Sequence, residues 1–177
     1  DLASLHQELV ASPDLLIVQD LDGVCIPLVK DPLTRTLSPE YVHAAARLRG
    51  SFSVLTNGEH EGRRGVNRLV ETALGDSATA RSHGLYLPGL AAGGVQLQDE
   101  FGHVTHPGVS ESEISFLASV PERMKALMSS MLPALMPELN DEQLAVELEL
   151  AVLDTQLSPT INLNHLFSRT PDDVAHQ

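Results

Sequence analysis

Tryptophan is absent from this sequence, aromatic residues make up only 3 % of it, and there is a single cysteine. One cysteine cannot form an intramolecular disulfide, which excludes a disulfide-stapled fold. Cys25 lies in an apolar stretch, so we expect it to be a small buried hydrophobic residue. Basic residues are also scarce, because 11 Lys and Arg stand against 24 Asp and Glu, a formal net charge of -13. Nucleic acids and anionic membranes bind basic surfaces, so this balance argues against both as the main partner.

Long hydrophobic runs are lacking as well. No stretch approaches the ~20 apolar residues that a membrane-spanning helix needs, so we expect no membrane partner. Residues 1–4 lack the basic and apolar regions of a signal peptide, and a cytoplasmic location is the simplest expectation. The chain has 177 residues, of which 42 % are hydrophobic. That length suits one large domain, or one domain and part of another.

Short apolar runs alternate with helical patterns in the first half of the chain. Residues 15–18 are too few for a helix and predict a strand that is buried on both faces, and Phe52–Leu55 predict a second strand. Between them, Ser38 and a following proline predict a helix that begins near residue 39. Residues 61–74 carry apolar side chains at helical spacing. Together with a short helix at residues 3–11, this order predicts an α/β fold with a parallel sheet.

The second half has a different pattern. Apolar residues on both sides of an acidic, glycine-containing turn at residues 99–102 predict a β-hairpin. Ser110 and Glu113 have the spacing of a capping box, which predicts a helix start. Pro121 is expected to end or kink that helix, or to begin a second one, and Pro133 and Pro137 are expected to break the pattern.

Residues 144–152 alternate strictly between apolar and other side chains, which favours a strand, although residues 140–143 could also cap a short helix. Residues 158–160 predict a turn, and residues 161–164 alternate again. The change of pattern near Pro107 and Gly108 predicts a domain boundary. We therefore expect a first domain over residues 1–107 and part of a second over residues 108–177.

Two acidic residues follow the first predicted strand, in the sequence Asp20-Leu21-Asp22-Gly23. Ligand sites of open parallel sheets gather at the carboxyl ends of the strands. Two carboxylates this close repel each other unless a cation lies beside them, and Mg²⁺ would also attract a phosphate. Asp20 could then attack phosphorus, while Asp22 protonates the leaving oxygen and deprotonates water. The alternative is an ordinary acidic turn, which the position after an apolar strand disfavours.

Thr56, Asn57 and Gly58 follow the second predicted strand. A hydroxyl and free backbone N–H groups at a helix start can bind an anion, although a simple N-cap is the alternative. Together with the acidic loop, these residues predict a phosphate site. His60 is placed to reach the mouth of that pocket and contact the substrate. Arg63 and the arginine after it suit a solvated helix face better than an anion contact.

The acidic loop and the Thr56-Asn57-Gly58 segment resemble the first two motifs of the haloacid dehalogenase-like phosphatases. This resemblance implies a Rossmann-like core with an α+β cap domain. It also implies that Asp20 is the nucleophile and a metal ligand, and that Asp22 is the acid/base whose backbone carbonyl binds Mg²⁺. Thr56 would bind the phosphate.

A narrower resemblance extends over residues 16–25, 55–60, 84–96 and 158–164, which are similar to the glucosylglycerol-phosphate phosphatases of cyanobacteria. This resemblance implies hydrolysis of glucosylglycerol 3-phosphate, a small-molecule sugar phosphate, to the osmolyte glucosylglycerol in salt-stressed cells. A phosphatase for sucrose phosphate or another sugar phosphate is the alternative within enzymes.

The resemblance also shows where the chain departs from the superfamily pattern. The lysine or arginine that steadies the phosphate and the later acidic pair of the metal site are not recognisable here. Asp172 and Asp173 have no apolar strand before them and are not assigned to that role. Residues 1–107 therefore correspond to an incomplete core and residues 108–177 to the opening of a cap, and a non-catalytic binding fragment is the remaining alternative. Asn162 and Asn164 could bind sugar hydroxyls, or simply lie on an exposed face.

Overall fold

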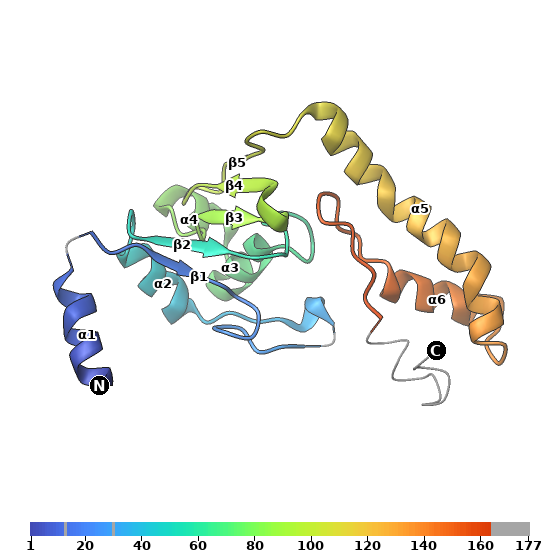
Figure 1. Ribbon diagram of the computed structural model, residues 1–177, viewed down its shortest axis with the longest axis horizontal. Coiled ribbons are helices and arrows are strands. Elements are labelled where there is room, and N and C mark those ends of the chain that lie inside the picture. Colours follow the sequence, from blue (N-terminus) through green and yellow to red (C-terminus); the bar gives the residue numbers. More distant parts are fainter. Residues whose placement is uncertain (13, 30, 164–177) are drawn as a thin grey trace.

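The computed structural model describes residues 1–12, 14–29 and 31–163. Its centre is a five-stranded sheet in which the strands lie side by side in chain order (Figure 1). The strands are β1 (Ile17–Gln19), β2 (Phe52–Leu55), β3 (Gly89–Ala91), β4 (Gln96–Gln98) and β5 (Val104–Thr105). The first three strands pair in parallel, and β4 and β5 form the predicted antiparallel hairpin. The predicted α/β fold is therefore confirmed.

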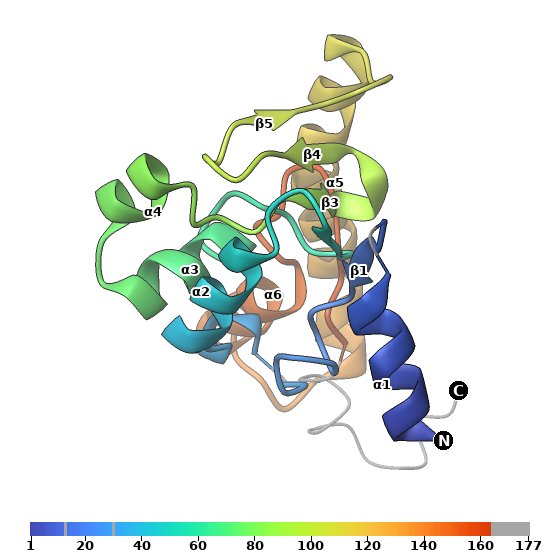
Figure 2. The same ribbon diagram turned by 90° about the vertical axis from the view of Figure 1, so that its left-hand side faces the viewer.

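One face of the sheet is covered by helices. These are α2 (Pro39–Arg47), α3 (Val66–Leu74) and α4 (Ser77–His83), and Figure 2 shows them together on one side. The register places Ile17 opposite Phe52, so these two side chains point to the same face. They pack there with Val42 of α2 and with Leu69 of α3, and they form the main hydrophobic core.

The other face of the sheet is open in the described structure. Val18 is 56 % exposed and Leu55 is 50 % exposed, and Leu90 and Leu97 are exposed beside them. The prediction that the first strand is buried on both faces is therefore wrong. The physical reason is that α2, α3 and α4 all pack on the same side of the sheet and leave side chains on its other side uncovered.

Most helices of the first half begin at a residue whose side chain caps the helix. The predicted short helix at the N-terminus is confirmed as α1 (Leu2–Ala11), and Ser38 caps α2 as expected. The helix predicted over residues 61–74 begins only at Val66, because the preceding residues form a loop that folds back on the helix start. In that loop, the Val66 N–H donates to the Glu59 carbonyl at 2.9 Å. The helix α4, whose N-cap is Asp76, was not predicted from the sequence.

A long helix, α5 (Glu111–Leu135), begins at the predicted capping box of Ser110 and Glu113. Pro121 and Pro133 both lie inside this one helix, so the expected end at Pro121 and the expected break at Pro133 are wrong, whereas the helix does end before Pro137. Each proline removes a backbone donor, but packing of the helix against its neighbour can offset that loss. That packing includes Leu132, in a hydrophobic cluster separate from the main core.

The neighbour of α5 is a second helix, α6 (Asp141–Ala151), so the predicted strand over residues 144–152 is wrong. Asn140 and Gln143 form a capping box at its start. The alternating pattern also places Leu144, Leu148 and Ala151 at helical spacing, and these residues pack in the cluster shared with α5. The two hydrophobic clusters lie on opposite sides of residue 107 in the sequence, and the division into domains there stays a prediction.

After α6, the chain turns back toward the loops of the sheet (Figure 1). A single antiparallel bridge joins Val152 to Ile161, where alternation had suggested a further strand. Asn164, Asp172 and Asp173 lie outside the described residues. Among the helices that the structure describes, none combines the length and apolar character that crossing a membrane requires.

Gly89 allows β3 to approach β2 closely. An added Cβ would lie 2.1 Å from the Val54 carbonyl oxygen, and the φ angle of +139° is one that side chains rarely adopt. We expect Gly89→Ala to destabilise the full-length protein by at least ~2 kcal/mol in urea unfolding, because backbone atoms cannot move aside easily. The control is Gly50→Ala, with a φ of +83° and no described atom within 4 Å of the added carbon, where the expected cost is about 1 kcal/mol. Equal stability of the two variants would contradict the close approach.

Candidate active site

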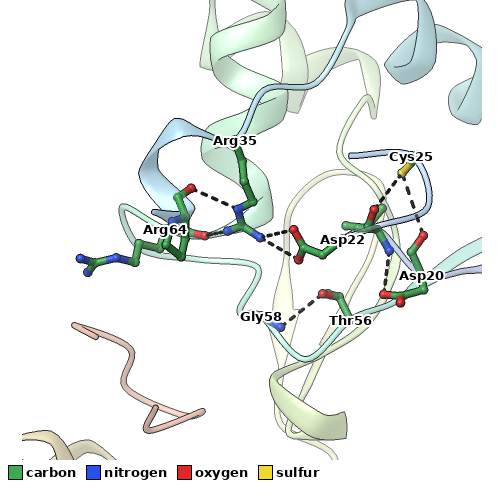
Figure 3. A network of polar contacts seen from close by, with 9 residues as sticks. Asp20, Asp22, Cys25, Arg35, Thr56, Gly58 and Arg64 are labelled. Carbon is green, nitrogen blue, oxygen red and sulfur yellow. Dashed lines mark hydrogen bonds and ion pairs between the residues drawn. The ribbon is translucent and has the colours of Figure 1, made fainter. Parts of the chain in front are cut away.

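The loops that follow β1 and β2 meet at the carboxyl ends of these strands. Figure 3 shows Thr56 and Gly58 beside the loop that carries Asp20 and Asp22. Parallel pairing causes this meeting, because the strands run in the same direction and end at the same edge. The structure thus brings together four of the residues that the sequence analysis placed in the site.

The loop after β1 is built around a buried leucine. Leu21 has no exposed surface, and its carbonyl accepts from the N–H groups of Cys25 at 3.1 Å and Ile26 at 3.0 Å. Gly23, with a φ of +82°, completes the turn and donates to the Ile26 carbonyl at 2.7 Å. Burial of Leu21 leaves the two aspartates on either side of it directed away from the core. The side chain of Asp20 is exposed at the end of the strand.

Arg35 holds the second aspartate. Its Nη1 lies 2.9 Å and 3.2 Å from the two carboxylate oxygens of Asp22. The guanidinium also donates to the Pro32 carbonyl at 3.1 Å and to the Arg64 carbonyl. Arg35 is only 8 % exposed, so its charge is largely removed from water and depends on these partners. Arg35 was not predicted as a site residue, because nothing near it in the sequence indicates a partner 13 residues away.

The loop after β2 is fixed by backbone hydrogen bonds to the end of β3. Buried Thr56 donates its N–H to the Leu90 carbonyl at 3.0 Å, and the Gly58 carbonyl accepts from the Ala92 N–H at 2.7 Å. The Thr56 hydroxyl oxygen accepts from the Gly58 N–H at 3.2 Å. Its own proton therefore remains available for another acceptor. Asn57, between these two residues, is exposed.

His60 has a different environment from the one predicted. Its side chain has no exposed surface, and its Nε2 lies 2.9 Å from the Gly89 carbonyl oxygen. The His60 backbone N–H donates to the side chain of Gln96 at 2.7 Å. Burial lowers the pKa of His60, which keeps the ring neutral. The ring lies against β3 and His60 does not line the pocket, so the contact between His60 and substrate stays a prediction that this burial does not support.

A pocket of about 210 Å³ opens beside Asp22. One wall comes from the loops of the sheet, and the opposite wall comes from the segment that follows α6. The residues that line it on the two sides include Asp22, Arg35, Gly58, Asp154, Thr155 and Ser158. Two regions nearly a hundred residues apart in the sequence therefore enclose one cavity.

The described residues match part of a magnesium site. Mg²⁺ prefers oxygen ligands, and the exposed carboxylate of Asp20 and the backbone carbonyl of Asp22 are of that kind. The carboxylate of Asp22 is already engaged by Arg35. Within residues 1–12, 14–29 and 31–163, no three His, Cys, Asp or Glu side chains gather closely enough to hold a metal ion. A complete site would need further ligands.

A family model described as glucosylglycerol-phosphate phosphatase matches residues 14–177. The chain belongs to the glucosylglycerol-phosphate phosphatase family. A curated glucosylglycerol-phosphate phosphatase of Synechocystis sp. is 49 % identical over 172 residues, which cover 97 % of this chain and 41 % of that relative. The chain thus spans about two fifths of the length of the relative it matches, and the family resemblance drawn from the motifs is confirmed.

Arg35 offers a test of how the site is held together. Arg35→Lys keeps the charge but cannot reach the Asp22 carboxylate and two carbonyls at once. We expect a loss of about 1–3 kcal/mol in the free energy of unfolding of the full-length protein, because buried acceptors lose their donors. The control is Arg47→Lys at the exposed end of α2, which should change stability by less than about 0.5 kcal/mol. Similar stabilities for both variants would show that the Arg35 contacts contribute little.

Proposed function

We propose that this chain carries the nucleophile and the acid/base of a Mg²⁺-dependent phosphatase. Its reaction is the hydrolysis of glucosylglycerol 3-phosphate to glucosylglycerol and phosphate, in osmolyte synthesis during salt acclimation. The supporting observation is the meeting of Asp20 and Asp22 with the Thr56–Gly58 loop, in a chain of the glucosylglycerol-phosphate phosphatase family. This arrangement supports phosphoryl transfer better than a non-catalytic role, because the acidic loop and the phosphate loop come from different strands and meet at one edge.

In the first step, a carboxylate oxygen of Asp20 attacks phosphorus. The bond between phosphorus and the ester oxygen breaks, and the leaving oxygen takes a proton from Asp22. The products are an aspartyl-phosphate at Asp20 and free glucosylglycerol. Exposure of Asp20 suits this role, since a nucleophile must be open to the incoming phosphate.

In the second step, Asp22 takes a proton from water as the water oxygen attacks phosphorus, and the bond to Asp20 breaks to release phosphate. Nη1 of Arg35 lies within hydrogen-bonding distance of both Asp22 carboxylate oxygens and holds this side chain beside the pocket.

The loop after β2 holds the phosphate in this proposal. The Thr56 hydroxyl accepts from the Gly58 N–H and can donate its own proton to a phosphate oxygen. Arg35 lies at the same pocket and adds positive charge to a chain whose net charge is -13. Asp20 and the Asp22 carbonyl would bind Mg²⁺, which offsets the repulsion between the carboxylates and the phosphate when bound.

The nucleophile is tested by Asp20→Asn in the full-length protein. Since an amide cannot form the acyl phosphate, we expect phosphate release from glucosylglycerol 3-phosphate in the presence of Mg²⁺ to fall by at least ~10⁴-fold, with an unchanged melting temperature. Asp14→Asn is the matched control, because Asp14 is exposed and precedes β1. Activity retained by Asp20→Asn would disprove the aspartyl-phosphate mechanism.

A panel of sugar phosphates that includes sucrose phosphate should show a preference for glucosylglycerol 3-phosphate, and a preference for sucrose phosphate would reassign the substrate.

Gly58 tests the position of the phosphate. A Cβ added there would lie 3.7 Å from the Thr56 hydroxyl oxygen and 3.9 Å from Nη1 of Arg35, which are ordinary contact distances. We therefore expect Gly58→Ala to fold normally. The new methyl group would occupy space beside the Thr56 hydroxyl, the proposed phosphate contact, so the KM of the full-length protein for its substrate should rise about tenfold or more. A normal KM together with normal stability would place the phosphate elsewhere.

A further inference from the structure

The loop that follows the phosphate loop is fastened to a distant part of the chain. Residues 59–64 contact residues 154–160, which follow α6, and these two segments form opposite sides of the pocket. Figure 1 shows the second segment extending from the helical pair toward the loops of the sheet. We call residues 154–160 the returning segment.

Glu59 makes the central attachment. One of its carboxylate oxygens accepts from the backbone N–H groups of Leu157 at 2.5 Å and Ser158 at 2.9 Å. The Ser158 hydroxyl lies 3.3 Å from the same oxygen. Glu59 is only 7 % exposed, so these donors replace much of the water that an exposed carboxylate would have. Hydrogen bonds to a charged acceptor of this kind are stronger than those between neutral groups.

Asp154 makes a second attachment at the other end of the returning segment. Its carboxylate pairs with Nε of Arg63 at 2.5 Å and with the guanidinium of Arg64. Arg64 is itself buried, and its carbonyl accepts from Arg35. The returning segment is thereby connected to the guanidinium that holds Asp22.

The base of the returning segment has its own hydrogen bonds. The Leu153 N–H donates to the Thr160 carbonyl at 3.0 Å, and the Asn162 N–H donates to the Ala151 carbonyl at 2.6 Å. These bonds join the two ends of the returning segment to each other, but they do not attach its middle, around Leu157 and Ser158, to the loops of the sheet. The position of this middle part over the pocket therefore depends on Glu59 and on the ion pairs of Asp154.

The returning segment presents oxygen atoms to the pocket. The hydroxyls of Thr155 and Thr160 both donate to the Ser158 carbonyl, at 2.8 Å and 2.7 Å. Since their protons are used in this way, their oxygen atoms remain acceptors for hydroxyl groups of a ligand. Such a wall suits a polyhydroxylated group better than an apolar one.

We propose that Glu59 is a positioning residue that holds the returning segment as the wall contacting the non-phosphate part of the substrate. This inference rests on the proposed phosphatase function and extends it. Glu59 does not touch the phosphate in this view. It selects polyhydroxylated phosphate esters over simple ones by keeping Thr155 and Thr160 at the pocket.

The test compares two substrates in the full-length protein with Mg²⁺: glucosylglycerol 3-phosphate and p-nitrophenyl phosphate, which lacks hydroxyl groups on its leaving group. We expect Glu59→Ala to raise the KM for the sugar phosphate roughly tenfold or more, with kcat/KM for the simple ester changed by less than about twofold. Glu59→Gln keeps an acceptor oxygen and should raise the KM for the sugar phosphate less than Glu59→Ala does. It provides a second variant for the test if Glu59→Ala does not fold. The exposed Glu138→Gln is the matched control and should leave both substrates unaffected.

Hydrogen exchange gives a second readout, which does not depend on the reaction. The amide protons of Leu157 and Ser158 should exchange at least roughly tenfold faster in Glu59→Ala. An equal loss of activity on both substrates, an unchanged preference between them, or unchanged exchange would overturn the proposal. If the wild-type protein prefers another sugar phosphate, the proposed substrate fails, and the same comparison made with that ester still decides the role of Glu59. A wild-type protein that hydrolyses neither class would overturn both proposals.

Discussion

Three short parallel strands, β1, β2 and β3, end at the same edge of the sheet, and the loops that carry the two aspartates and Thr56 follow β1 and β2 there. The pairing is close because Gly89 lets the backbones of β2 and β3 approach each other. Hydrogen bonds from the end of β3 then hold the Thr56–Gly58 loop, while burial of Leu21 shapes the acidic loop. Helices on one face alone are sufficient to organise these loops, since both loops start from strands whose inner residues pack on the same core.

The pocket contains several positively charged side chains, although the net charge of the chain is negative. The chain is strongly acidic, yet Arg35, Arg63 and Arg64 all line the pocket. Each of them is bound by a carboxylate, Asp22 or Asp154. These ion pairs join the acidic loop, the loop before α3 and the returning segment in one connected network around the cavity. The three guanidinium groups are therefore held in defined positions around the cavity.

The sequence predicted the order of strands and helices in the first half well, because apolar runs and caps such as Ser38 are local signals. The secondary structure predicted from the sequence was wrong where one pattern of apolar residues is compatible with both a strand and a helix. Residues 144–152 suit a strand by alternation and a helix by spacing, and packing against α5 decided for the helix. The burial of His60 was not predicted for a related reason, since nothing near it in the sequence shows that its ring lies against the Gly89 carbonyl of β3.

By itself, the sequence determined the family and the chemical types of the predicted site residues, because the Asp20–Gly23 and Thr56–Gly58 segments are each contiguous and follow recognisable strands. Only the tertiary structure decided that Arg35 holds Asp22 and that Glu59 binds Leu157, across separations of 13 and 98 residues. Such partners have no local signal, since any exposed carboxylate or backbone N–H could serve. Folding of the chain selects one of them by placing it within hydrogen-bonding distance.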